Sequence, residues 1–143
     1  MLIARLVALI EDHADELTAR LVRRLLEDQR TSEYRRFDEA ELGKRAHDVY
    51  AHLGHWLEKS SEGRVEEEYF GLGETRHSEG IPLAQVVSAL LLTRRNLWQF
   101  VESMGGDTVL ELRQQLDLEL LVVRFFDRAI YHTVRGYESA GNE

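Results

Sequence analysis

The residues best suited to chemistry in this sequence are an arginine and an aspartate that fall inside apolar helical patterns. Arg94 interrupts the apolar pattern of the segment 82–104, and Asp127 lies within an apolar stripe of the segment 107–137. Because a buried unpaired charge is costly, the two side chains are expected to form a hydrogen-bonded ion pair in the core. Two alternatives remain open: Arg94 binds a small carboxylate or phosphate, or its side chain reaches the solvent.

A second group, Asp48, His52 and His55, has the spacing i, i+4 and i+7 that places three metal-binding side chains on one helical face. This face points away from the apolar stripe of the same segment, and the sequence supplies no further groups to orient the ligands. A solvated polar face is therefore the favoured interpretation, and no metal is expected.

The histidines also raise the question of iron. Glu74 and His77 match the Glu-x-x-His step of carboxylate-bridged di-iron bundles, but those sites need the step on two helices and the sequence carries it once. His77 or His13 could instead ligate haem, although a single histidine beside an apolar face is more often a packed residue. The leading prediction is that no cofactor binds; a haem-binding or small-ligand-binding protein is the alternative.

Other catalytic signals are missing from the sequence. It has no glycine-rich phosphate loop, no nucleophile elbow and no carboxylate pair beside a histidine. It has no cysteine, which excludes disulfides, thiolate metal sites and cysteine nucleophiles. The prediction is that the chain is not an enzyme and has no catalytic residues.

Five predicted helices must position the groups described above. The chain has one proline, Pro82, and its apolar residues recur at helical spacing without strand-like alternation. Asp38 followed by Glu41 predicts a helix start, and Asp107 is expected to cap the last helix. The predicted helices cover residues 1–30, 38–59, 64–78, 82–104 and 107–137.

These helices predict an all-α fold, either globin-like or a helical bundle, with long helices at the two ends of the chain. A chain of 143 residues has the size of one domain. The single domain 1–143 is divided into a first helix at 1–30, the remaining helical core at 31–138 and a tail at 139–143.

The last predicted helix has two apolar stripes. One is expected to face the core and consists of Leu112, Leu116, Leu120, Val123, Ile130 and Val134. The other is expected to form a homodimer contact and consists of Leu118, Leu121, Val122, Phe125 and Ala129. A helix that is apolar on both sides is either central in its own domain or shared with a partner. The alternative to the dimer is packing of the second stripe against the first helix of the same chain.

Charge and hydropathy restrict the partners. The formal net charge is −8, which argues against nucleic acid because phosphate binding needs a basic face. No apolar run approaches the ~20 residues that cross a bilayer. Arg5 and the acids from Glu11 onwards interrupt any secretory signal. A cytoplasmic protein with no membrane and no nucleic-acid partner is expected.

Three parts of the sequence carry a resemblance to a known family. They are "GETRHSEGIPLAQVVSALLLTRRNLWQFV", "ADELTARLVRRLLED" with the following "EYRRFDEAEL", and "FFDRAIYHTVRGYES". In their pattern of helices and turns they resemble the N-terminal domains of RsbR-type and RsbRD-type co-antagonists of the bacterial stressosome. The resemblance covers nearly the whole chain.

The resemblance implies a bacterial stress-response sensor module, globin-like or bundle-like and without haem, that is dimeric and signals through its last helix. Family members of this kind regulate a partner-switching kinase through a separate C-terminal domain. The chain stops at Glu143, just past the last helix, so the tail at 139–143 would lead toward an output domain that is absent here. The chain is accordingly expected to be an isolated input domain or a free-standing member with a regulatory protein partner.

Overall fold

Residues 2–106 and 108–142 are described here by a computed structural model. Within these residues the chain forms seven α-helices and two short 3-10 helices, η1 and η2. In chain order they are α1 (Leu2–Asp12), α2 (Ala14–Glu27), η1 (Gln29–Arg36), α3 (Glu39–Ala51), α4 (Leu53–Trp56), η2 (Lys59–Ser61), α5 (Glu62–Ser78), α6 (Leu83–Ser103) and α7 (Val109–Gly141). The predicted all-α single domain is confirmed.

The predicted count of five helices is wrong, because two of the predicted helices are broken at a histidine. The first breaks at His13, which has φ −106° and ψ 18° and lies with its Nδ1 2.7 Å from the carbonyl oxygen of Leu9. The second breaks at His52, after which the amide of Gly54 donates a hydrogen bond of 3.1 Å to Glu11 in α1. The long helix predicted at the start of the chain is therefore two shorter helices. The long helix predicted at the other end is present as α7, with 33 residues.

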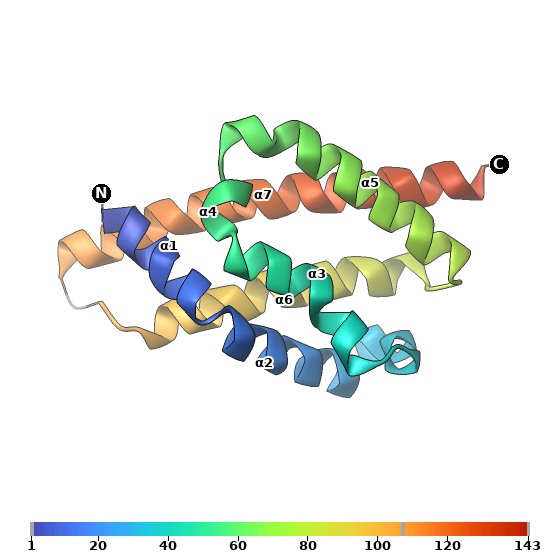
Figure 1. The fold of residues 1–143 in the computed structure, drawn as a ribbon, viewed down its shortest axis with the longest axis horizontal. Helices are drawn as coiled ribbons and strands as arrows, with labels where there is room; N and C mark the ends of the chain where they lie inside the picture. The colour runs from blue at the N-terminus through green and yellow to red at the C-terminus, as the bar shows by residue number, and fades with distance from the viewer. Residues whose placement is uncertain (1, 107, 143) are drawn as a thin grey trace.

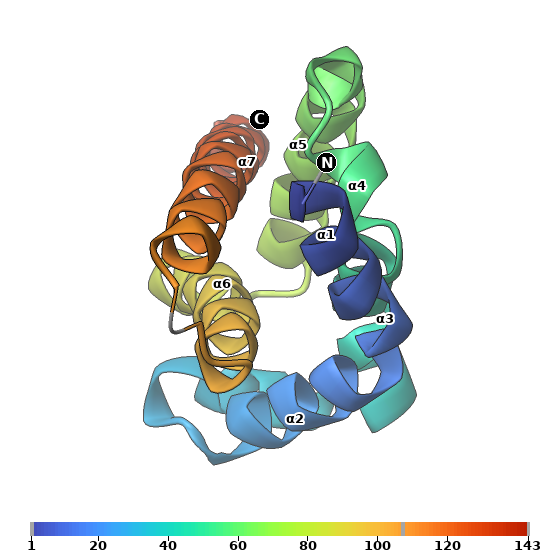
Figure 2. The ribbon, with the colours of Figure 1, turned by 90° about the vertical axis from the view of Figure 1, so that its left-hand side faces the viewer.

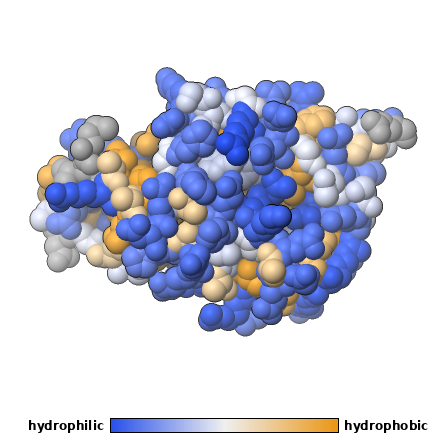
Figure 3. Space-filling view, viewed as in Figure 1, coloured by the Kyte–Doolittle hydropathy of each residue, from blue (hydrophilic) through white to orange (hydrophobic). Residues whose placement is uncertain are grey.

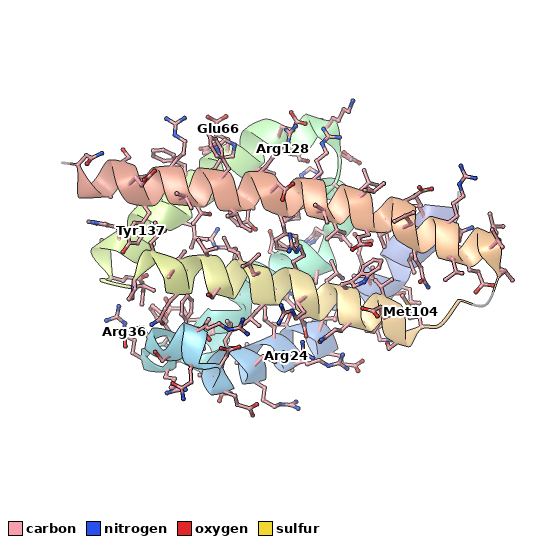
Figure 4. All side chains as sticks on the ribbon, turned by 180° about the vertical axis from the view of Figure 1, so that it is seen from behind. Arg24, Arg36, Glu66, Met104, Arg128 and Tyr137 are labelled. Carbon is pink, nitrogen blue, oxygen red and sulfur yellow. The ribbon has the colours of Figure 1, made fainter. Side chains whose placement is uncertain are left out.

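The helices enclose a core along the length of α7. Both α5 and α6 lie along α7 (Figure 1), and from behind α7 and α6 run side by side across the molecule (Figure 4). In the end-on view, α6 lies between α7 and α2, while α1, α3 and α5 stand on the opposite side (Figure 2). Each fully buried large apolar side chain contributes about 1.5–3 kcal/mol. The most deeply buried of them include Ile10, Leu17, Leu21, Tyr50, Leu53, Ile81, Leu97, Leu118 and Phe126.

Local sequence sets the start of α3 and the ends of α5 and α6. The carboxylate of Asp38 accepts a hydrogen bond of 3.2 Å from the amide of Glu41, so the predicted start of α3 is confirmed. Gly80 and Gly105 have φ of 74° and 77°, a backbone conformation that glycine adopts without steric cost. These two residues follow the ends of α5 and α6.

The start of α7 has a cap that differs from the predicted one. Oγ1 of Thr108 accepts a hydrogen bond of 3.0 Å from the amide of Glu111. A threonine in this position satisfies one of the amides that the first helical turn leaves without a partner. The predicted cap, Asp107, lies outside the described residues.

None of the helices in the described part of the chain combines the length and the apolar composition needed to span a lipid bilayer.

Candidate functional site

The last helix, α7, buries the apolar stripe that was expected to form a dimer contact. Leu118, Val122, Phe125 and Ala129 are between 0 and 4 % exposed, and Leu121 is half-buried. Among the other elements, α5 makes the most extensive contact with α7, and α6 and α1 also contact it. The structure therefore corrects the expected contact: the stripe belongs to the core of its own chain.

Aromatic packing explains why this stripe is the buried one. The ring of Phe125 meets the rings of Trp56 and Tyr69 edge-on, with centroids 5.8 Å and 5.9 Å apart. It also packs edge-on against Phe126 at 5.0 Å. Such edge-to-face pairs add about 0.5–1.5 kcal/mol each to the free energy gained by burial. The alternative expectation placed this stripe against the first helix; α1 does contact α7, but α5 makes the more extensive contact.

The opposite stripe of α7 is exposed in its N-terminal half. Leu112, Leu116 and Leu120 are 54 %, 54 % and 62 % exposed, and we call these three residues the α7 leucine row. The space-filling view shows apolar residues gathered at the end of the molecule where α1 and the first turns of α7 lie (Figure 3). The expected inward orientation of this stripe is therefore wrong for the leucine row. The rings packed around Phe125 bury the opposite face of α7 instead.

Arg94 and Asp127 are not brought together as a buried pair. Arg94, in α6, is half-buried, and Asp127, in α7, is exposed. At about 100° per residue, Asp127 falls on the side of α7 that carries the leucine row, which faces away from the core. In the described residues no ion pair joins Arg94 to Asp127. The ion pair was expected because the sequence analysis took this side of α7 to face the core, and that orientation is wrong.

The three residues considered for metal binding are spread around a bend. His52 ends α3, and its Nδ1 lies 3.3 Å from Oδ1 of Asp48. Asp48 also accepts a hydrogen bond of 3.2 Å from the indole of Trp56. His55 is turned toward Arg64, with Nε2 3.5 Å from Nη1. Among the described residues, no three acidic or histidine side chains lie close enough together to hold a metal ion.

The residues considered as iron ligands are also separated. Glu74 is exposed, whereas His77 is half-buried and packs edge-on against the ring of Tyr137, with centroids 5.0 Å apart. His13 lies at the other end of the molecule, where its ring packs against Phe100 at 5.2 Å. Both histidines therefore have aromatic packing partners.

The close contact between the backbones of α5 and α7 depends on two glycines, Gly73 and Gly136, that sequence reasoning did not single out. We call this contact the glycine seam. A Cβ atom added to Gly73 would overlap the carbonyl oxygen of Thr133, and one added to Gly136 would overlap the carbonyl oxygen of Phe70. Only glycine allows two helix backbones to approach this closely. The sequence does show glycines inside helical patterns, where glycine lowers helix stability. Here these glycines mark the positions at which the two backbones touch.

Polar side chains join α5 and α7 at both ends of the same seam. At the start of α5, Oε1 of Glu62 lies 2.5 Å from Nη2 of Arg124 and 2.6 Å from Nη1 of Arg128, which Figure 4 labels. At the other end, the hydroxyl of Tyr137 donates a hydrogen bond of 2.6 Å to the carbonyl oxygen of Ile81, after α5. These contacts hold the C-terminal half of α7 against α5.

The distinctive features of the described residues are a long terminal helix, a glycine seam and an exposed leucine row. Residues 15–143 match the sequence model of the RsbT co-antagonist protein rsbRD N-terminal domain. That range includes almost all of α2 and every element after it. No curated protein and no solved structure matches the chain. Because the match spans most of its length, the chain belongs to the family of RsbT co-antagonist protein rsbRD N-terminal domains.

Proposed function

We propose that this chain is a non-catalytic regulatory input domain that forms a homodimer and passes a signal through α7. Membership of the RsbT co-antagonist domain family supports a regulatory role. The structural observation that carries the proposal is the exposed leucine row of α7. The partner that receives the signal is a regulatory protein of the RsbT pathway or an output domain. The domain acts in the cytoplasm.

The leucine row is the surface that we assign to the dimer. Its three side chains are one helical turn apart, so they form a continuous apolar strip. Scattered apolar residues are common on protein surfaces, but a contiguous strip marks an interaction site. A second copy of α7 offers an equally apolar strip, and two-fold pairing of identical surfaces is the commonest assembly of identical chains.

The glycine seam supplies the route for the signal. Because the backbones of α5 and α7 touch at Gly73 and Gly136, a displacement of α5 cannot be absorbed by side-chain rearrangement alone. It moves α7 as a rigid body. In this arrangement, the N-terminal half of α7 holds the dimer together and the C-terminal half carries the displacement.

Native mass spectrometry of wild type and of Leu116→Arg tests the dimer. We expect wild type at twice the 16.6 kDa mass of the chain and Leu116→Arg as a monomer. A charge in the centre of an apolar interface loses its hydration without gaining a partner. Because Leu116 is 54 % exposed in the single chain, the circular dichroism spectrum of the variant should match that of wild type.

Ala19→Arg is the matched control, because it places the same charged side chain on an exposed position of α2. This variant should remain dimeric. A wild-type monomer at all concentrations, or a dimer that persists in Leu116→Arg, would overturn the assignment of the leucine row.

A further inference from the structure

A cavity of about 50 Å³ lies in the core where α2, η1, α3, α5, α6 and α7 meet. Its walls are mainly apolar and include Leu21, Ala46, Val86, Ala89 and Phe126. A void of this size exceeds the space of one water molecule, and an apolar void is a poor place for water. The cavity is therefore suited to a small apolar group.

The cavity adjoins a surface cleft between α3 and α5. The cleft has a volume of about 650 Å³, and four of its lining residues, Leu42, Arg45, Leu72 and Arg76, also line the cavity. The two helices make no extensive contact with each other, although both pack closely on other helices. These four residues border both spaces, so a ligand that enters the cavity from the cleft passes between them.

Two arginines, Arg45 and Arg76, are the charged residues that line the cavity. Each makes one ion pair within the described residues: Nη1 of Arg45 lies 3.5 Å from Glu68, and Nη1 of Arg76 lies 2.7 Å from Glu79. A guanidinium carries five N–H donors, so each keeps donors for another carboxylate. Nε of Arg76 is buried and has no hydrogen-bond partner within the described residues.

The side chain of Arg76 is held in place by two aromatic rings. Its guanidinium lies over the rings of Tyr34 and Phe37, 5.5 Å and 5.0 Å from their centroids. The side chain is only 19 % exposed. A guanidinium fixed in this way loses little freedom when it binds an anion.

The neutral groups of the cavity fit the same class of ligand. Tyr34 and Tyr69 line it, and burial raises the pKa of both hydroxyls, so they remain protonated donors near neutral pH. The cavity liners in the described chain include no histidine, so His13 and His77 are not placed to ligate a group there. Cationic and neutral donors beside an apolar pocket select an anion with an apolar tail.

We propose that this site binds a short-chain monocarboxylate, with its alkyl tail in the cavity and its carboxylate at Arg45 and Arg76. A cavity of about 150 Å³ holds benzene, so a third of that volume takes a tail of two or three carbons. Propionate and butyrate are the ligands of matching size. The inference rests on the proposed function only in treating the bound acid as the signal; binding itself requires no dimer.

Titration of sodium butyrate into the full 143-residue chain, followed by ¹H–¹⁵N and methyl NMR, tests the site. We expect saturable shifts at Ala46, Ala89 and Thr93 below about 50 mM, because a ligand of this size binds with a millimolar dissociation constant. Affinity should rise about fourfold per added CH₂ from acetate to butyrate and then level off. Equal binding of 1-butanol, or of acetate and butyrate, would overturn the proposal.

Variants separate the two halves of the site. Arg45→Gln and Arg76→Gln should each weaken butyrate binding at least about tenfold, since each removes a charge-assisted hydrogen bond. Arg64→Gln is the matched control, because Arg64 lines the cleft but not the cavity, and its affinity should equal that of wild type. Unchanged binding in both arginine variants would refute the assigned carboxylate position.

Filling the cavity provides an independent check. Ala89→Leu should abolish butyrate binding, while the dispersion of its ¹H–¹⁵N NMR spectrum stays that of a folded protein. If this variant does not fold, Ala46→Val provides the same test with less added volume. Butyrate binding that survives cavity filling would refute the tail position. Native mass spectrometry of the same samples reports the dimer separately, so a failure of ligand binding is distinguishable from a failure of the proposed function.

Discussion

At the scale of single residues, the acid Glu62 shows how one side chain ties α5 to α7. Hydrogen bonds from Arg128 and Arg124 hold the pKa of Glu62 below its ordinary value of 4.5. A carboxylate whose pKa is lower in the folded state stabilises the fold above its unfolded pKa and loses this contribution as pH falls through the folded pKa. Wild type should therefore be more stable than Glu62→Gln at pH 7, and the difference should shrink from about pH 5 to about pH 3.

Urea denaturation across this pH range measures the difference. Glu67→Gln is the control, because Glu67 is exposed on the same helix and should show no such narrowing relative to wild type. If the difference in the free energy of unfolding between wild type and Glu62→Gln were the same at all pH values, the ion pairs would not act through the charge of Glu62.

At the scale of elements, the seam between α5 and α7 makes a prediction from glycine alone. Gly73→Ala and Gly136→Ala each force a methyl group against the backbone of the opposite helix, and overpacking of this kind costs about 1–3 kcal/mol or more. Gly71→Ala, on the same helix α5, meets no atom within 4 Å. Since alanine is the better helix former by up to about 1 kcal/mol, Gly71→Ala should be neutral or stabilising. The free energy of unfolding in urea distinguishes the three variants, and equal losses would contradict the seam.

At the scale of the whole molecule, the leucine row of α7 makes stability depend on concentration. Association of two folded chains into a dimer shifts the equilibrium between folded and unfolded protein toward the folded state by mass action. The midpoint of thermal unfolding should therefore rise with protein concentration for wild type and stay constant for Leu116→Arg. The scanning rate and buffer must be the same for both. A wild-type midpoint that does not depend on concentration would speak against a folded dimer.

Features with local causes were predicted well. The helix start at Asp38 depends on residues within one turn of each other, and it lies as expected. The helix breaks at His13 and His52 were missed, because they depend on distant contacts. His13 packs on Phe100 in α6, and the chain after His52 turns back to meet Glu11 in α1.

By itself, the sequence determined an all-helical chain, its main helix boundaries, its family and the two apolar stripes of α7. The tertiary structure alone decided which stripe is buried, and with it the places of Arg94 and Asp127. Periodicity states which residues share a face of a helix, but two faces of similar hydrophobicity gain similar free energy from burial. The choice fell to partners distant in sequence: the rings around Phe125 and the glycines that bring α5 against α7.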